Sequence, residues 1–129
     1  MLEPPRVLVV GATGYLGSHI IKQLQREEYD FKALARNRQK LLDLGLHDHQ
    51  VVEAQATDPD SLVDLCKNID VVISCLGITR QRDGLKYMDV DYQANFNILV
   101  EAEKSGVEKF IYISATHGHY RSLNKLFIK

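Results

Sequence analysis

Short runs of apolar residues recur along the chain, and amphipathic segments separate them. The apolar runs predict five strands, at residues 6–10, 31–35, 50–54, 70–75 and 109–114. Within each run the apolar positions are largely consecutive rather than alternating, which is typical of strands covered on both faces. The pattern therefore favours a parallel sheet between two layers of helices.

Four helices are predicted between these strands. Residues 37–44 are predicted to form a short helix, and residues 88–105 a long one. Gly106 can end the long helix, because glycine readily adopts the left-handed conformation found at helix C-termini. Asp58 can cap another helix, with Pro59 at its first position. That helix would carry Leu62, Val63, Leu65 and Cys66. The first helix, over residues 14–26, places on one stripe Leu16, Ile20, Ile21 and Leu24.

The order of these elements predicts an α/β fold, a doubly wound parallel sheet with strand order 3-2-1-4-5 and helices on both faces. The length is typical of one domain, so residues 1–129 are interpreted as a single unit. Residues 77–86 are expected to form a long polar loop, and residues 120–129 to begin a further helix. A substrate lobe is absent, so the C-terminal part is interpreted as truncated, or the chain as a minimal domain that needs a partner.

Composition and charge narrow the range of partners. The 129 residues carry a formal net charge of −1, which gives no general attraction for nucleic acid or anionic lipid. The apolar runs are far shorter than the roughly 20 residues needed to cross a bilayer. Two cysteines, Cys66 and Cys75, are too few for a disulfide framework. We therefore expect a cytoplasmic protein that acts on a small molecule and binds neither nucleic acid nor a membrane.

A glycine-rich stretch, GATGYLG at residues 11–17, joins the first predicted strand to the first helix. In this context Gly11 permits a tight turn, Gly14 lets a pyrophosphate approach the backbone, and Gly17 lets the helix pack close to the sheet. The free N–H groups at the start of the helix would face the phosphates. The alternative is a glycine turn used only for packing. We predict that a dinucleotide binds here.

The end of the second predicted strand favours NADP over NAD. An acidic residue there would bind the ribose hydroxyls of NAD, but the chain reads Ala35-Arg36-Asn37-Arg38. Arg36 can pair with a 2′-phosphate, and Arg38 and Lys40 add positive potential. The alternative is a solvated helix start with ordinary basic residues. NADP is the predicted cofactor, with NAD as the alternative.

Five stretches of the chain resemble the short-chain dehydrogenase/reductase superfamily, in its extended and atypical branches. In chain order they are GATGYLG at 11–17, ALARN at 33–37, ATDPDSL at 56–62, VVISCLG at 71–77 and DYQANFNILVEAEKSGVEKFIYIS at 91–114. Among atypical members the chain is similar to NAD(P)-binding proteins related to the nitrogen-metabolite-repression regulators and to sugar-nucleotide epimerases. The resemblance implies a Rossmann fold.

The resemblance also implies roles for individual residues. It places Asp58 near the adenine, and Leu76 and Gly77 beside the ribose on the nicotinamide side. The complete predicted cofactor site is Gly11, Thr13, Gly14, Tyr15, Leu16, Gly17, Arg36, Asp58, Leu76 and Gly77.

Enzymes of this superfamily use a Ser or Thr together with the Tyr and Lys of a YxxxK pair, in which the Tyr acts as acid or base. Thr116 matches the hydroxyl position. The pair itself has no match, because Tyr120 and Lys125 are five residues apart and do not share a helix face. The chain as given therefore lacks a complete catalytic triad.

Three functions remain open at this point. An intact enzyme would transfer a hydride between NADPH and a carbonyl or sugar-nucleotide-type substrate. The first alternative is a non-catalytic NADP(H)-binding regulatory or assembly protein. The second is a small NADPH-dependent flavin or tetrapyrrole reductase, which can work without the Tyr–Lys pair.

Other polar groups receive simpler interpretations. The histidines of residues 47–49 and 117–119 lie in predicted turns without a cysteine or carboxylate set, so no metal site is predicted. Residues 79–82 form either a solvated loop or a contact for an anionic substrate. Cys75 is expected to be a small core residue, and Asn95 to fix the backbone of a loop.

The predicted helix over residues 88–105 has a second apolar stripe, formed by Tyr92, Phe96 and Val100. The resemblance to the superfamily implies that this helix can pair with its copy, so a homodimer through residues 88–105 is expected.

Overall fold

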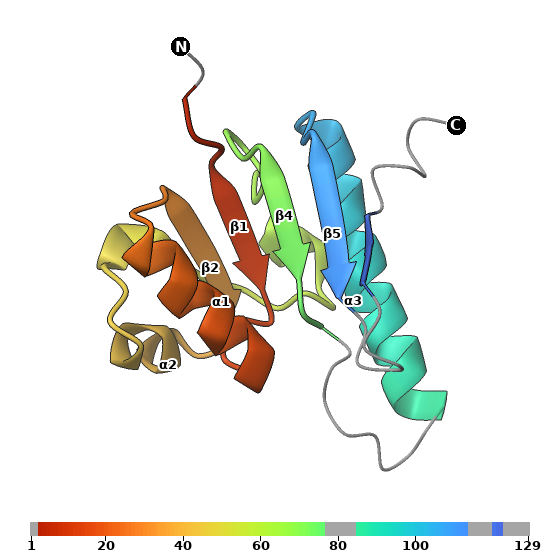
Figure 1. The fold of residues 1–129 in the computed structure, drawn as a ribbon. Coiled ribbons are helices and arrows are strands. Elements are labelled where there is room, and N and C mark those ends of the chain that lie inside the picture. Colours follow the sequence, from red (N-terminus) through yellow and green to blue (C-terminus); the bar gives the residue numbers. More distant parts are fainter. Residues whose placement is uncertain (1–2, 77–84, 114–119, 123–129) are drawn as a thin grey trace.

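A six-stranded sheet with the order β3-β2-β1-β4-β5-β6 forms the centre of the computed structural model (Figure 1). The structure describes residues 3–76, 85–113 and 120–122. The first five strands pair in parallel, which confirms the predicted doubly wound sheet with order 3-2-1-4-5. The strands are β1 Val7–Val10, β2 Phe31–Ala35, β3 Val51–Glu53, β4 Val71–Ser74, β5 Lys109–Ile113 and β6 Tyr120–Ser122.

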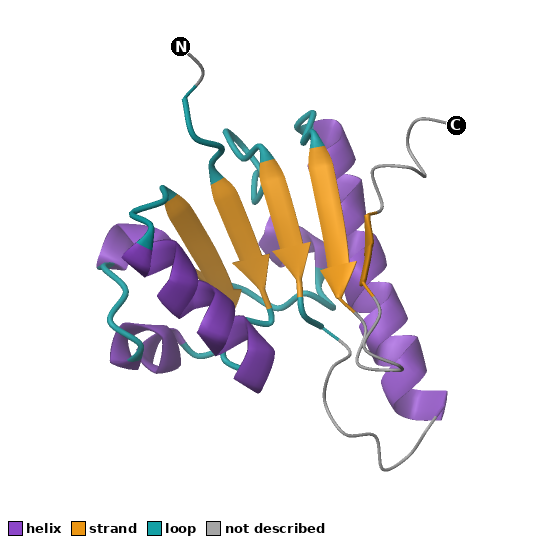
Figure 2. Ribbon diagram, viewed as in Figure 1, coloured by secondary structure: helices purple, strands orange, loops and turns teal. Residues whose placement is uncertain are grey.

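Helices cover both faces of this sheet (Figure 2). On one face lie α1 and α2, and on the other lies α3. The helices are α1 Tyr15–Arg26, α2 Arg38–Asp43 and α3 Leu85–Lys104, with the short 3-10 turns η1 Asp48–Gln50 and η2 Pro59–Leu62. As predicted, α3 is followed by Gly106 in the left-handed region, at φ +72°. It begins at Leu85, inside the segment that was expected to be a loop.

The sheet separates two hydrophobic cores, and β1 contributes to both. Val7 and Val9 pack on the side of α1 and α2, while Leu8 and Val10 pack on the side of α3. All four side chains of β1 are buried. Because side chains alternate between the faces of a strand, a strand covered on both faces must be apolar at every position. This explains the consecutive apolar residues of β1 in the sequence.

The prediction of a helix that starts at Asp58 is correct only for its first turn and wrong beyond it. Asp58 does cap the turn, since its Oδ1 accepts from the backbone N–H of Asp60 at 3.1 Å, but only the 3-10 turn η2 follows. Asp64 and Asn68 adopt left-handed conformations, with φ of 63° and 64°, and these interrupt any helical path. Val63 is consequently exposed on the surface rather than buried in a helix face.

The helix predicted over residues 120–129 is also wrong where the structure describes it. Residues 120–122 form β6, which runs antiparallel to β5 with Ile113 opposite Tyr120. Without β6, β5 would leave a row of unpaired backbone groups at the sheet edge. Pairing with that edge overrides the helical spacing of the apolar residues. Residues 123–129 lie outside the described part of the chain.

Candidate functional site

The glycine turn lies at the carboxyl end of β1, where it leads into α1. Gly11 has a φ of +80°, which favours glycine. A Cβ on Gly11 would lie 2.9 Å from the carbonyl carbon of Cys75 and 3.1 Å from the amide nitrogen of Leu76. The turn therefore packs directly against the backbone that leaves β4. The sheet order places β1 and β4 at the switch point, where open α/β sheets bind their ligands.

Gly14 occupies the N-cap position of α1 and does not need to be glycine for the protein's own packing. Its φ of −76° suits any residue, and a Cβ there would meet nothing closer than the Gly11 carbonyl oxygen at 3.6 Å. No side chain caps the helix, and its first turn contains no acidic residue. The first N–H groups of a helix have no intrahelical partners. The geometry therefore leaves an open space beside an uncapped, positive helix end, which suits an anion.

Gly17, in contrast, is required by packing. A Cβ at this position would lie 2.1 Å from the Gly11 carbonyl oxygen and 2.8 Å from the Cα of Ala12. The absent side chain lets α1 rest directly on the turn that precedes it. Gly17 was predicted to allow close packing of the helix, and the contact that it allows is with the backbone of Gly11 and Ala12.

The other predicted residues of the turn differ in exposure. Thr13 is exposed and Leu16 is half-buried. Tyr15 is 82% exposed, and its ring meets the His19 ring edge-on with centroids 4.5 Å apart. An aromatic ring this exposed contributes little to the core. The side chains of Thr13 and Tyr15 are thus accessible to a ligand that binds at the turn.

Arg36 directly follows β2, at the same carboxyl edge of the sheet. It is exposed, and no residue in the described part of the chain forms a hydrogen bond or ion pair with its side chain. The next residue, Asn37, caps α2, because its Oδ1 accepts from the backbone N–H of Gln39 at 2.9 Å. The backbone next to Arg36 is therefore fixed by this cap, and the exposed guanidinium of Arg36 is available to an anionic ligand.

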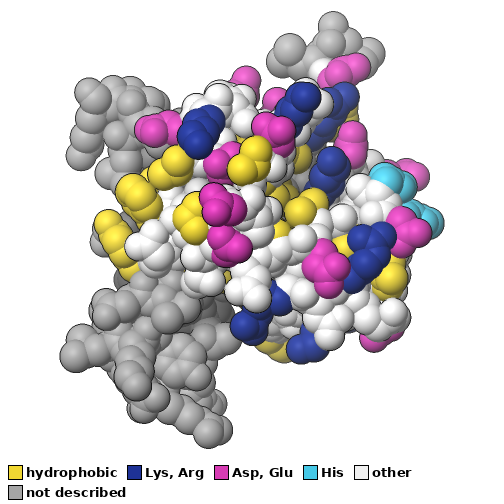
Figure 3. All heavy atoms as spheres, turned by 180° about the vertical axis from the view of Figure 1, so that it is seen from behind, with side chains coloured by type: hydrophobic (Ala, Val, Ile, Leu, Met, Phe, Trp, Pro, Cys, Tyr) yellow, Lys and Arg dark blue, Asp and Glu magenta, His cyan; other side chains and the backbone are white. Residues whose placement is uncertain are grey.

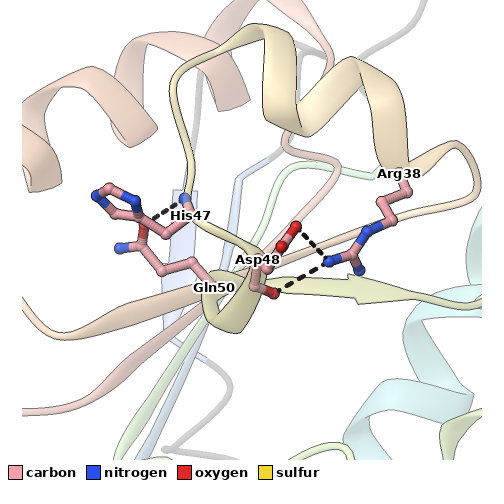
Figure 4. Close-up of polar contacts among 4 residues, drawn as sticks. All are labelled: Arg38, His47, Asp48 and Gln50. Carbon is pink, nitrogen blue, oxygen red and sulfur yellow. Dashed lines mark hydrogen bonds and ion pairs between the residues drawn. The ribbon is translucent and has the colours of Figure 1, made fainter.

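Arg38 behaves differently from the prediction. It was expected to add positive potential beside Arg36, but its Nη2 lies 2.7 Å from Oδ1 of Asp48 (Figure 4). The carboxylate offsets the charge of Arg38, so the guanidinium of Arg36 is the less compensated of the two. The expectation is corrected because Asp48, ten residues along the chain, is brought to Arg38 by the turn η1.

Asp58 lies in the loop that follows β3, and its exposed carboxylate caps η2 through one oxygen. A carboxylate has a second oxygen that can accept a further hydrogen bond. The same loop is fixed to α3, since Asn97 donates from Nδ2 to the carbonyl oxygen of Ala56 at 2.9 Å. The capping role is thus observed, and the contact with adenine stays a prediction.

The backbone that leaves β4 is held by a short chain of hydrogen bonds. The N–H of Leu76 donates to Oγ of Ser74 at 3.4 Å, and the Ser74 hydroxyl donates to Oδ1 of Asn95 on α3. The N–H of Cys75 donates to the carbonyl oxygen of Val10 at 2.8 Å. Asn95 therefore fixes this loop, as expected, but does so through Ser74.

Two of these positioning residues, Ser74 and Asn97, escaped the sequence-based prediction. Both are buried polar side chains. The available signals were a serine that ends an otherwise apolar strand and an asparagine one residue before the buried Ile98. Such residues are normally buried only with hydrogen-bond partners.

Some predicted site residues cannot be placed. Gly77 and Thr116 lie outside the described residues, as do residues 79–82 and the histidines of residues 117–119. Their proposed roles therefore stay predictions. Leu76, the last described residue of this loop, is half-buried next to Gly11.

Both cysteines are buried free thiols. Burial raises the pKa of Cys75 from 9.0 to about 11. Burial, and secondarily the negative charge of Glu101, raise the pKa of Cys66 to about 12. Because only the thiolate is a strong nucleophile, neither thiol has catalytic character near neutral pH.

Two further features bear on partners. Tyr92 and Phe96 on α3 are exposed by 69% and 47%, and their rings stack with centroids 6.2 Å apart. Hydrophobic side chains gather along this side of the molecule (Figure 3). The expected homodimer through α3 stays a prediction.

Among the described residues, no helix is long and apolar enough to span a membrane. In the same part of the chain, no group of His, Cys, Asp and Glu is arranged to hold a metal ion.

Comparison with known proteins identifies the family of this chain. The family model described as NAD(P)H-binding matches residues 11–127. The chain is 32% identical over 109 residues to the photosystem II assembly factor Ycf39 of Synechocystis sp., covering 84% of this chain and 33% of that protein. It is 31% identical over 122 residues to the chloroplastic divinyl chlorophyllide a 8-vinyl-reductase of Arabidopsis thaliana, covering 84% of this chain and 29% of that protein.

The fold is shared with solved structures. The UDP-Glc/GlcNAc 4-epimerase of Campylobacter jejuni superposes with a TM-score of 0.71 at 20% identity, over 84% of this chain and 36% of the epimerase. The chain thus spans about a third of the length of the proteins it matches.

Proposed function

Because this chain belongs to the family of NAD(P)H-binding proteins, we propose that it binds NADP(H) in preference to NAD(H). The observation that carries the preference is the exposed Arg36 guanidinium at the end of β2, which has no partner in the described part of the chain. A 2′-phosphate offers that guanidinium a charge-assisted, bidentate contact.

Different residues at the carboxyl edge of the sheet bind different parts of the nucleotide. The uncapped start of α1 and the open space at Gly14 suit the pyrophosphate. Arg36 binds the 2′-phosphate, and the free oxygen of Asp58 accepts a hydrogen bond from the adenine. The backbone at Leu76, fixed by Ser74 and Asn95, lines the nicotinamide side. When bound, the reduced nucleotide supplies a hydride, and the protein supplies binding and orientation.

Replacing Arg36 with alanine should lower NADPH affinity about tenfold and leave NADH affinity unchanged. A charge-assisted hydrogen bond contributes roughly 1.5–3 kcal/mol, and the exposure of Arg36 favours the lower end. Calorimetric titration of both nucleotides measures the effect. Arg26→Ala is the matched control, because Arg26 ends α1, one helix length from the glycine turn. Equal affinities of the native protein for NADPH and NADH would remove Arg36 from the site.

The use made of the nucleotide is a separate proposal. The first candidate is a binding module in protein assembly, in keeping with the 32% identity to an assembly factor. The second is a tetrapyrrole reductase, which the 31% identity to the 8-vinyl-reductase favours. Neither candidate depends on a YxxxK pair, and none of the six tyrosines in the sequence has a lysine four residues later.

We therefore expect the 129-residue chain to oxidise NADPH with simple carbonyl compounds no faster than a protein-free control. The decay of NADPH absorbance measures this rate. Divinyl chlorophyllide a is the informative second substrate, because sustained turnover with it supports the reductase. Rapid reduction of a carbonyl compound would show that proton transfer here does not need the Tyr–Lys pair.

A further inference from the structure

The two arginines that follow β2 are in different electrostatic states. Arg36 has no ion-pair partner among the described residues, whereas Nη2 of Arg38 lies 2.7 Å from Oδ1 of Asp48. The same nitrogen also donates to the backbone carbonyl oxygen of Asp48 at 3.4 Å. Figure 4 shows the Arg38 side chain reaching from the start of α2 to the turn η1. Of these two cations, which are two residues apart in the sequence, one is free and one is paired.

The ion pair between Arg38 and Asp48 is exposed to solvent, so another anion can replace Asp48 as the partner of Arg38. The Asp48 side chain is 82% exposed and that of Arg38 is 38% exposed. Exposed ion pairs contribute little free energy because water screens both charges. A phosphate group carries up to two negative charges and can compete with a single carboxylate for a guanidinium. A phosphate can therefore displace Asp48 from Arg38. Because Asp48 must be displaced first, it lowers the affinity of Arg38 for that phosphate.

The position of Asp48 does not depend on Arg38. The turn η1 is closed by its own hydrogen bonds. The N–H of His47 donates to Oε1 of Gln50 at 2.9 Å (Figure 4). The N–H of Gln50 donates to the His47 carbonyl oxygen at 2.9 Å. The backbone N–H of Val51 donates to the carbonyl oxygen of Asp48. An asparagine at position 48 can keep these backbone contacts while losing the charge.

We propose that Asp48 determines how strongly the protein selects NADP(H), by competing with the 2′-phosphate for Arg38. The proposal rests on the proposed function, since it concerns the same phosphate that Arg36 binds. Asp48 contacts Arg38 and acts through it, so it is a positioning residue. Removing its charge frees a second guanidinium two residues from the first.

The test is titration of the purified protein and its Asp48→Asn variant with NADPH and NADH. We expect NADPH to bind about three times more tightly to the variant, a change of the size that an exposed ion pair supports. NADH affinity should not change, because NADH has no 2′-phosphate. In an Arg38→Gln background, the Asp48→Asn substitution should have no effect on either nucleotide.

Asp43→Asn is the matched control for net charge. Asp43 also belongs to this region, but its Oδ1 accepts a hydrogen bond from Gln39 rather than from an arginine. An equal gain in NADPH affinity from Asp43→Asn would reduce the effect of Asp48 to general electrostatics and overturn the proposal. Unchanged NADPH affinity in Asp48→Asn would overturn it as well. A native protein that binds both nucleotides equally contradicts the proposed function instead, and the Asp48→Asn comparison still decides the role of Asp48.

Discussion

Replacing Gly14 with valine should abolish dinucleotide binding and leave the fold intact. A Cβ at this position meets only the Gly11 carbonyl oxygen, at 3.6 Å, and the backbone angles suit any residue. Replacing glycine with valine at the N-cap lowers helix stability by about 1 kcal/mol. The protein itself thus tolerates the side chain, whereas a pyrophosphate that approaches the backbone at this point would not.

The expected loss of affinity is at least about a hundredfold. Two lost hydrogen bonds to phosphate, each contributing roughly 1.5–3 kcal/mol, account for a loss of that size. Calorimetry with NADPH measures the affinity, and thermal unfolding measured by circular dichroism checks the fold. Native NADPH affinity in a folded Gly14→Val variant would show that the phosphates bind elsewhere.

The fold could be predicted because its main signal is local. A strand covered on both faces must be apolar at each position, and β1 shows this within four residues. The helix expected after Asp58 failed for the opposite reason. Leu62, Leu65 and Cys66 are buried as a helix would bury them, but left-handed residues at Asp64 and Asn68 bring them there. Aspartate and asparagine tolerate that conformation, and hydrophobic spacing does not report it.

Residues 120–122 show a second limit of local patterns. A strand of three residues has almost no periodicity of its own. Its conformation follows from the free edge of β5, which lies several residues earlier in the chain. The apolar spacing beyond Tyr120 favours a helix by itself, so the prediction was wrong for residues 120–122 because the deciding contact there is tertiary.

The candidate site likewise has features that local sequence predicts and features that only the tertiary structure reveals. The roles predicted for Gly11 and Arg36 rest on a strand, a turn and a helix that are adjacent in sequence. The state of Arg38 depends on Asp48, which is brought to it only by the path of the chain between α2 and β3. The link from Leu76 through Ser74 to Asn95 likewise joins β4 to α3 across 21 residues. Side-chain pairs of this kind require the tertiary structure.

Replacing Gly17 with alanine should destabilise the whole domain, although the same substitution at Gly14 should be tolerated. Two effects oppose each other at position 17. Alanine is favoured over glycine inside a helix by about 1 kcal/mol. Against this, its Cβ would lie 2.1 Å from the Gly11 carbonyl oxygen and 2.8 Å from the Cα of Ala12. Both neighbours are backbone atoms, which cannot move aside by changing a rotamer.

The steric effect should dominate. Overpacking in a well-packed region costs about 1–3 kcal/mol and occasionally more, and rigid backbone neighbours favour the upper end. We expect a net loss of about 2 kcal/mol or more, a large share of the roughly 5–15 kcal/mol that stabilises a typical domain. Urea unfolding of Gly17→Ala beside Gly14→Ala measures the difference with an identical chemical change three residues apart. Equal midpoints would mean that α1 can shift away from the turn, and the division of roles between packing at Gly17 and ligand space at Gly14 would then fail.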